Sequence, residues 1–147
     1  MTFYKRLGEM KMFIVENDEL LRDSMALFFR TKGCMVQAFG SAEEASPVME
    51  SLPPDIVICD HGLPGMDGMA LLSGVGARHP AAAKILIGAH PGPRLAEEAK
   101  RAGIDEVLLK PFSVDEIERA LERRLRPRLD GGPPTDGAGR VPGEEIA

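Results

Sequence analysis

Five short apolar segments recur along this chain, and stretches with helical spacing separate them. Four of the segments are almost uninterrupted runs of leucine and β-branched residues, and the fifth is weaker. Runs without alternating polar residues are typical of strands that are covered on both faces, as in a parallel sheet. The segments are residues 12–15, 34–39 (the weaker one), 55–59, 84–88 and 106–109.

A helix is predicted after each apolar segment. The first lies within residues 18–32 and ends at Gly33, the residue type that most often closes a helix. The third and fourth are predicted over residues 68–79 and 93–102. The second and fifth open with capping boxes, which are Ser41 with Glu44 and Ser113 with Glu116. Strand and helix alternate five times, which predicts an α/β fold with helices on both faces of a doubly wound, parallel, five-stranded sheet.

The length of the chain fits one folded domain with flanking segments. A chain of 147 residues is long enough to bury one hydrophobic core. We expect an N-terminal extension over residues 1–10, a domain over residues 11–126 and a tail over residues 127–147. Proline and glycine dominate the tail, which has almost no large apolar residue, so it is predicted to be disordered.

Net charge and apolar content exclude several classes of function. A formal net charge of −5 argues against direct nucleic-acid binding. No apolar run approaches the roughly 20 residues of a membrane-spanning helix, and residues 1–11 lack the apolar centre of a signal peptide. Cys34 and Cys59 stand inside apolar segments and are predicted to be buried, free thiols. We therefore expect a cytoplasmic protein that does not bind a membrane.

Charged side chains gather at the ends of the predicted strands. In open parallel sheets, ligands bind beyond the carboxyl ends of the strands, so these residues are expected to form the site. Glu16, Asn17 and Asp18 stand at the end of the first strand, and Asp60 stands at the end of the third. Gly88 stands at the end of the fourth strand, and Lys110 at the end of the fifth. Acids from two strands repel one another unless a positive charge lies among them. Several oxygen ligands suit Mg²⁺ or Mn²⁺, with the lysine beside the metal.

Three stretches of the sequence resemble one known family. They read "IVENDELLR", "PDIVICDHGLPGMDG" and "VLLKPFSVDEI", and they resemble the receiver domain of two-component response regulators over residues 11–126. The specific part is the D-x-x-L-P-x-M-D-G signature together with the later K-P-F. The resemblance implies a flavodoxin-like (βα)5 fold in which one aspartate takes a phosphoryl group from a phosphohistidine.

The resemblance also implies a role for each residue that matches the family motif. Asp60 would be the phosphoacceptor, and Lys110 would contact the phosphoryl oxygens. Glu16 and Asn17 fall at the acidic pair that holds the metal, and Gly62 would offer its backbone carbonyl. The chemistry agrees, since a metal ion and an ammonium are the groups that stabilise the charge spread over a transferring phosphoryl group.

Three positions depart from the receiver pattern. Asn17 stands where the family has an acidic metal ligand, so one formal charge is missing and weak Mg²⁺ binding is expected. Gly88 stands at a switch position where the family has a threonine or serine hydroxyl; His90 could donate instead. Val107 stands where the family has an aromatic switch residue. Either the switch uses a different linkage or phosphorylation no longer drives it.

Two groups of charged residues also have simpler interpretations. Asn17 or Asp18 suits the N-cap of the first helix. The last helix carries a basic run that is predicted to be a solvated face balanced by glutamates of the same helix, and a partner-docking role for this face is a further hypothesis. The run consists of Arg119, Arg123, Arg124, Arg126 and Arg128, and the glutamates are Glu116, Glu118 and Glu122.

Other classes that share the fold are disfavoured by the residues at the strand ends. A flavodoxin-type phosphate loop needs hydroxyl groups and glycine after the first strand, where this chain has acids that repel phosphate. A cobalamin-binding module needs a histidine two residues after Asp60, but His61 follows directly. A haloacid-dehalogenase-type phosphatase needs a second aspartate where Gly62 stands.

The predicted function is that of a response regulator receiver that takes a phosphoryl group on Asp60 from a histidine kinase or a phosphotransfer protein. It would signal through contacts with a downstream protein, and it would not be an enzyme beyond its own Mg²⁺-assisted phosphorylation and dephosphorylation. Whether it forms a homodimer is left open. The alternative is an atypical pseudo-receiver that binds its partner without phosphorylation.

Overall fold

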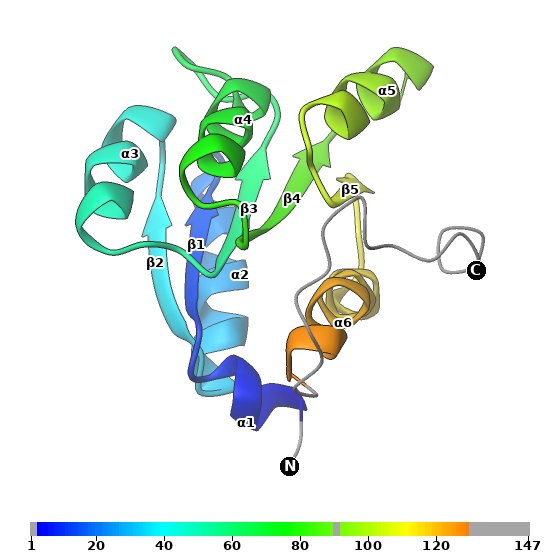
Figure 1. Cartoon of the computed structure of the whole chain (residues 1–147). Helices are drawn as coiled ribbons and strands as arrows, with labels where there is room; N and C mark the ends of the chain where they lie inside the picture. Colours follow the sequence, from blue (N-terminus) through cyan, green and yellow to red (C-terminus); the bar gives the residue numbers. More distant parts are fainter. Residues whose placement is uncertain (1–2, 90–91, 130–147) are drawn as a thin grey trace.

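The computed structural model of the chain describes residues 3–89 and 92–129. Five parallel strands form one sheet in the order β2-β1-β3-β4-β5 (Figure 1). Their bounds are Lys11–Val15 for β1, Met35–Phe39 for β2, Ile56–Asp60 for β3, Ala83–Gly88 for β4 and Glu106–Leu109 for β5. Every predicted segment, including the weaker one, forms a strand, and the predicted flavodoxin-like α/β fold is confirmed.

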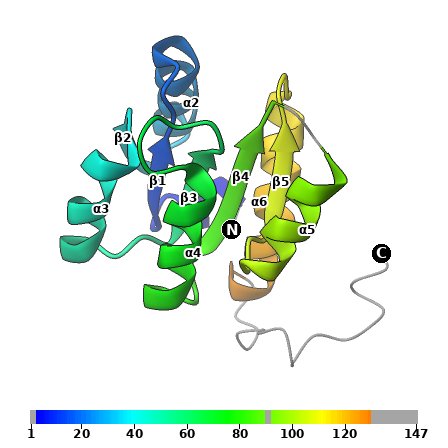
Figure 2. The same ribbon diagram turned by 90° about the horizontal axis from the view of Figure 1, so that it is seen from above.

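Helices cover both faces of this sheet. Seen from above in Figure 2, α2 and α6 lie on one face, and α3, α4 and α5 lie on the other. The helices are α1 (Phe3–Leu7), α2 (Glu19–Thr31), α3 (Ala42–Ser51), α4 (Gly68–Arg78), α5 (Pro93–Arg101) and α6 (Val114–Leu129). Among the described residues, no helix is long and apolar enough to cross a membrane.

The two faces of the sheet produce two separate apolar clusters. Met12 and Ile14 of β1 belong to the cluster beneath α2 and α6, whereas Phe13 and Val15 belong to the cluster beneath α3, α4 and α5. Successive side chains of a strand point to opposite faces, so a strand that is covered on both must be apolar throughout. This requirement is the physical reason for the uninterrupted apolar runs in the sequence.

The residues that the sequence predicts to cap the helices lie at the helix ends. The Asp18 carboxylate accepts a hydrogen bond from the Leu21 amide at 3.1 Å and thereby caps α2. Gly33 follows the same helix with a φ of +92°, which glycine adopts without strain. The Ser41 hydroxyl accepts from the Glu44 amide at 3.2 Å at the start of α3. Because Asp18 caps a helix, its carboxylate is already engaged outside the strand-end site.

The N-terminal segment contains a helix that the sequence does not predict. Residues 1–10 are expected to be an extension of the domain, yet α1 lies against α6 and its Leu7 side chain is 0% exposed. The Tyr4 hydroxyl also donates a hydrogen bond to the Glu118 carboxylate on α6. This helix has only five residues, which is too few to show a helical period in the sequence.

The last helix also extends further than the sequence predicts. The tail is expected from Pro127 onward, but α6 continues to Leu129. Pro127 removes one backbone hydrogen bond of the helix. It lies near the end of α6, but the helix does not end at this residue. The remainder of the predicted tail, residues 130–147, lies outside the described residues.

We expect Leu7→Ala to lower the free energy of unfolding by about 2–4 kcal/mol, the usual cost of emptying a fully buried leucine site. Urea denaturation followed by circular dichroism measures this change. Glu9→Ala is the matched control, because Glu9 is exposed and its loss is expected to cost less than about 0.5 kcal/mol. If both variants were as stable as the wild type, α1 would not belong to the folded unit.

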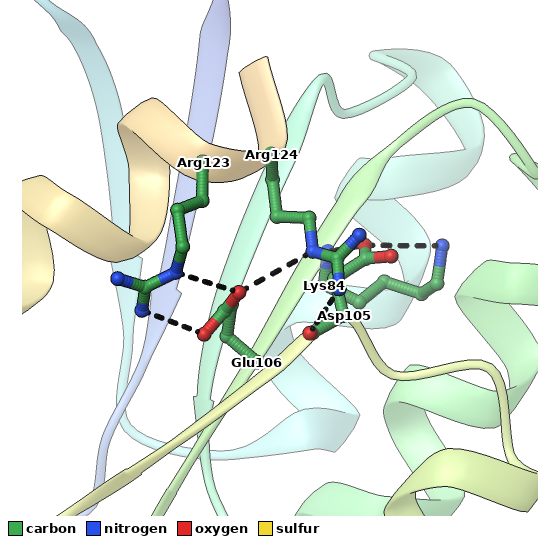
Figure 3. A network of polar contacts seen from close by, with 5 residues as sticks. All are labelled: Lys84, Asp105, Glu106, Arg123 and Arg124. Atoms are coloured by element: carbon green, nitrogen blue, oxygen red, sulfur yellow. Dashed lines mark hydrogen bonds and ion pairs between the residues drawn. The ribbon is translucent and has the colours of Figure 1, made fainter. Parts of the chain in front are cut away.

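Arg123 and Arg124 of α6 pair with Glu106 of β5 (Figure 3). Arg123 makes two hydrogen bonds to the Glu106 carboxylate, at 2.9 and 3.2 Å. Arg124 lies 3.4 Å from the same carboxylate and donates to the Asp105 carbonyl at 3.0 Å. The Asp105 carboxylate accepts in turn from the backbone amide of Lys84 at 2.8 Å.

The prediction that glutamates of α6 balance this basic run is therefore wrong for Arg123 and Arg124. Helical spacing identifies neighbours within a helix, but it gives no information about a strand that packs beneath it. Arg119 does lie 4.0 Å from an acid of its own helix, which is Asp115 and not one of the predicted glutamates. The side chains of residues 126 and 128 lie outside the described part of the chain.

Candidate functional site

Glu16, Asp60 and Lys110 meet at the carboxyl edge of the sheet. The Lys110 Nζ atom lies 3.1 Å from Glu16 Oε1 and 3.3 Å from Asp60 Oδ1. The Glu16 side chain is 1% exposed and the Asp60 side chain 10%, whereas that of Lys110 is 27% exposed. One ammonium thus bridges two buried carboxylates, and two negative charges and one positive charge leave a net charge of −1.

The order and register of the strands bring these three side chains together. Val15 of β1 pairs with Cys59 of β3, so Glu16 and Asp60 follow at the same level on neighbouring strands. Lys110 follows β5, two strands away from β3, and its amide donates to the Gly88 carbonyl at the end of β4 at 2.8 Å. The lysine side chain therefore crosses the end of β4 to reach Asp60.

Burial and pairing have opposite effects on the charges of this cluster. Burial raises the pKa of Glu16 above its usual value, although the Asp18 amide, which donates to Glu16 Oε2 at 3.0 Å, and Lys110 both lower it. Burial lowers the pKa of Lys110, but the hydrogen bond and charge of Glu16, together with Asp60, outweigh it and raise that pKa overall. Lys110 is therefore cationic at neutral pH, between two acids.

The loop after Asp60 is held close to the site. The His61 amide donates to the Ile87 carbonyl at 2.7 Å, which ties the start of the loop to β4. Gly68, the first residue of α4, packs so tightly that a Cβ there would lie 2.1 Å from the Asp60 carbonyl oxygen. Gly62 lies beside the Asp60 carboxylate, with an ideal Cβ 4.0 Å from Oδ2. Gly68 of the signature thus allows the start of α4 to lie against the backbone of Asp60.

Comparison with known proteins assigns the chain to a family. A family model described as the response regulator receiver domain matches residues 12–122. The chain belongs to this receiver family. The match covers the sheet, the strand-end acids and most of α6, so the family assignment includes all three residues that meet at the site.

Curated relatives of this receiver are longer regulators. The DNA-binding transcriptional regulator NtrC of Salmonella typhimurium is 32% identical over 139 residues, which is 88% of this chain and 30% of NtrC. The two-component response regulator PhoP of Pseudomonas aeruginosa is 31% identical over 117 residues, 80% of this chain and 52% of PhoP. The receiver thus spans about a third to a half of the length of these relatives.

Solved structures share the fold of this receiver. A CheY-like receiver domain protein from Methanospirillum hungatei JF-1 matches with a TM-score of 0.78 at 22% identity, over 84% of this chain and 98% of that one. NtrX from Brucella abortus, solved in complex with ATP, matches with a TM-score of 0.71 at 27% identity, over 83% of this chain and 29% of that one.

The oxygen donors of this receiver suit a hard divalent cation, and they carry little charge. Two carboxylates, those of Glu16 and Asp60, are buried at the ends of neighbouring strands, and Gly62 lies beside the carboxylate of Asp60. Asn17 is exposed and offers a neutral amide, and the Asp18 carboxylate caps α2. Within the described residues, no group of three or more acidic, histidine or cysteine side chains is arranged to hold a metal. The residues fit Mg²⁺, with a weaker charge attraction than three acids would provide.

The two predicted switch positions, Gly88 and Val107, lie against apolar side chains. Gly88 is buried at the end of β4, and a Cβ there would lie 3.1 Å from Cδ2 of Leu95 on α5. Val107 is half-buried and packs against the apolar cluster that contains Leu95. The space of the missing hydroxyl side chain is therefore partly taken by a leucine. His90 lies outside the described residues.

Gly88→Thr and Leu95→Ala are expected to be coupled. The threonine side chain crowds Leu95, and the alanine removes that crowding, so the double variant should be about 1 kcal/mol more stable than the two single changes predict by addition. A double-mutant cycle of urea unfolding measures this coupling. Additive effects, within about 0.3–0.5 kcal/mol, would show that Leu95 yields freely and does not occupy the hydroxyl position.

Sequence reasoning did not identify Glu43, which contacts the loop after Asp60. Its Oε2 atom accepts a hydrogen bond from the Met66 amide at 2.8 Å. The two residues are far apart in the sequence and belong to different helix–strand units, so no periodic pattern joins them. A clue is Gly65 within the signature, because its φ of +74° marks a turn that brings Met66 toward another element.

Proposed function

We propose that this receiver accepts a phosphoryl group on Asp60 from a histidine kinase or a phosphotransfer protein, and signals through protein–protein contacts. The observation that supports this role best is the position of Lys110. Its ammonium lies 3.3 Å from an Asp60 oxygen, on an acid that is mostly buried but keeps a 10% exposed side chain. A nucleophile, a cation and an opening to solvent therefore occur together.

In the proposed reaction, one Asp60 carboxylate oxygen attacks the phosphorus of a phosphohistidine. The new O–P bond forms while the N–P bond breaks, and its electron pair returns to the imidazole nitrogen of the donor. The negative charge of the transferring group spreads over its three equatorial oxygens. The Lys110 ammonium stabilises one of these oxygens, because it already lies beside the attacking carboxylate.

Glu16, Asp60, the Asn17 amide and the Gly62 carbonyl would hold Mg²⁺ or Mn²⁺ in this receiver. When bound, the ion supplies positive charge for the phosphoryl oxygens. Before transfer, Lys110 neutralises one of the two carboxylates, and the remaining negative charge attracts the cation. Because Asn17 contributes no charge, we expect this affinity to be low, which makes phosphorylation dependent on the metal concentration.

The proposed signal passes to a downstream protein, and the receiver acts as a catalyst only of its own phosphorylation and dephosphorylation. With glycine at position 88 and valine at position 107, the response to phosphorylation would have to pass through packing and not through a hydroxyl hydrogen bond. A cytoplasmic location stays a prediction.

The test is intact mass spectrometry after incubation with acetyl phosphate, with Mg²⁺ and with a chelator. We expect one phosphoryl adduct on the wild type in Mg²⁺, and no adduct on Asp60→Ala. Asp67→Asn is the matched control: it changes an aspartate of the same loop, keeps a residue that caps α4, and should be labelled like the wild type.

A wild-type protein that takes no adduct, beside another receiver that is labelled under the same conditions, would contradict the proposal. The pseudo-receiver alternative would then be favoured, in which the protein binds its partner without phosphorylation. The filled switch position at Gly88 and Leu95 is the observation that supports this second reading.

A further inference from the structure

The loop between β3 and α4 is fastened at several points. At its start, the His61 amide donates to the Ile87 carbonyl at 2.7 Å, and the His61 carbonyl accepts from the Gly68 amide at 3.3 Å. In its middle, the Leu63 side chain is buried in the apolar cluster beneath α3, α4 and α5. These contacts hold the two ends and the base of the loop.

The outer turn of the loop is fastened by a residue of another element. Met66 is exposed, and its amide donates to Glu43 Oε2 at 2.8 Å. Glu43 lies in the first turn of α3, on the same side of the sheet as α4. This hydrogen bond lowers the pKa of Glu43, which is therefore charged at neutral pH and makes a charge-assisted bond.

The turn itself is shaped to receive the Glu43 carboxylate. Gly65 has a φ of +74°, which a residue with a side chain rarely adopts. A Cβ at Gly65 would lie 2.5 Å from Glu43 Oε2, so the carboxylate occupies the space that the glycine leaves open. Backbone conformation and free space at this one residue both serve the contact with Glu43.

The position of this turn affects the phosphoacceptor site. Gly62 lies in the same loop, directly before the buried Leu63, and it is exposed to solvent beside the Asp60 carboxylate. A turn that moves away at Met66 frees the chain between Leu63 and α4. Leu63 is then held from one side only, and the Gly62 backbone directly before it is less well oriented. Precise orientation of ligands and reacting groups is what such supporting contacts provide.

We propose that Glu43 is a positioning residue for phosphoryl transfer, which holds the turn at Met66 and thereby keeps the loop that carries Gly62 in place beside Asp60. This inference rests on the proposed function, and it adds a residue outside the strand-end cluster. Glu43 does not touch the reacting atoms. It acts through the loop, from a helix that contributes nothing else to the site.

Two measurements without a phosphodonor test the proposal. In Glu43→Ala, hydrogen exchange of the Met66 amide in metal-free protein should become about three to ten times faster, as expected for loss of one side-chain acceptor. Calorimetric titration with Mg²⁺ should show a dissociation constant raised by a similar factor. Both results are independent of whether a phosphoryl group is ever transferred.

A third measurement connects Glu43 to the reaction. In the labelling reaction with acetyl phosphate, the Mg²⁺ concentration for half-maximal rate should rise in Glu43→Ala, while the rate at saturating Mg²⁺ stays within about twofold. A higher Mg²⁺ requirement with an unchanged maximal rate would show that the metal site is affected and the Asp60 nucleophile is not. Failure of the wild type to be labelled would contradict the proposed function. The hydrogen-exchange and Mg²⁺-titration results would then test on their own whether Glu43 positions the loop.

Two further variants separate the hydrogen bond from the charge. Glu43→Gln keeps a carbonyl acceptor for the Met66 amide and should retain most of the protection. Glu44→Gln removes the same charge one residue later and leaves the loop contact intact, so all three readouts should match the wild type. Equal effects of Glu43→Ala and Glu44→Gln would overturn the proposal, as would faster Met66 exchange with unchanged Mg²⁺ affinity.

Discussion

Replacing Lys110 by alanine is expected to slow phosphorylation of Asp60 about 100-fold and to lower the free energy of unfolding by about 3 kcal/mol near neutral pH. The rate falls because the ammonium beside the attacking carboxylate is lost. The stability falls because Glu16, with a 1% exposed side chain, keeps its charge and loses its ion-pair partner. Removing one partner of a buried ion pair leaves the other charge desolvated and uncompensated.

The loss of stability in Lys110→Ala should depend on pH. The pKa of Glu16 is already raised above its ordinary value of 4.5, mainly by burial, and it rises further without Lys110. An acid with a raised pKa in the folded state destabilises the fold only when it is ionised. The difference in unfolding free energy from wild type should therefore shrink as pH falls toward 4.5, grow as pH rises toward the folded pKa of Glu16 in the variant, and level off above it.

Urea unfolding at pH 5 and pH 7.5, together with the rate of adduct formation, measures both effects of Lys110→Ala. Lys110→Arg is the informative companion: it keeps the positive charge and should recover most of the stability, while its planar guanidinium fits the phosphoryl site less well. Lys100→Ala, on the exposed side of α5, should change neither quantity. Equal stability of Lys110→Ala and the wild type at both pH values would show that the ion pair contributes nothing to the fold.

The strand-end cluster could be expected from the sequence because three simple rules agree. Apolar runs mark the strands, and parallel sheets place their ligand sites beyond the carboxyl ends of the strands. The residues that follow each run can then be read from the sequence. In the structure, the Lys110 ammonium lies 3.1 Å from Glu16 and 3.3 Å from Asp60. Their chemical roles are still proposals, since proximity alone does not establish a reaction.

The contacts that could not be predicted from the sequence join residues of different secondary-structure elements, which no repeating pattern connects. Glu43 reaches Met66 from another helix, and Arg123 pairs with Glu106 from the strand beneath it. Such pairs depend on how helices are placed on the sheet, and this placement follows from packing of the whole domain. Leu7 shows the same limit, because burial of one leucine in a short helix has no signature in the chain.

The close packing of Gly68 against the backbone of Asp60 could not be predicted from the sequence, although the glycine itself is part of the recognised signature. Gly68 belongs to the signature that resembles receivers, and a turn preference would explain it equally well. The structure gives a more specific reason. The first residue of α4 lies against the backbone of Asp60 and against Cys59 Sγ, where a Cβ would lie 2.8 Å from the Asp60 carbonyl carbon and 3.1 Å from the sulfur.

Gly68→Ala is therefore expected to lower the free energy of unfolding by more than about 3 kcal/mol, at the upper end of what overpacking costs. A Cβ at 2.1 Å from the Asp60 carbonyl oxygen cannot be accommodated by rotating a side chain, because the atom it meets is backbone. Either the end of β3 or the start of α4 must move. Urea denaturation measures the cost, and intact mass spectrometry shows whether Asp60 is still labelled.

Gly74→Ala is the matched control in the same helix. Nothing lies within 4 Å of a Cβ at Gly74, so this variant should be stabilised by about 0.5–1 kcal/mol, the gain in helix propensity from glycine to alanine. The two changes have identical chemistry and differ only in what the methyl group meets. A Gly68→Ala protein as stable as Gly74→Ala would mean that α4 can withdraw from β3 at no cost, and that the close packing behind Asp60 does not position the phosphoacceptor.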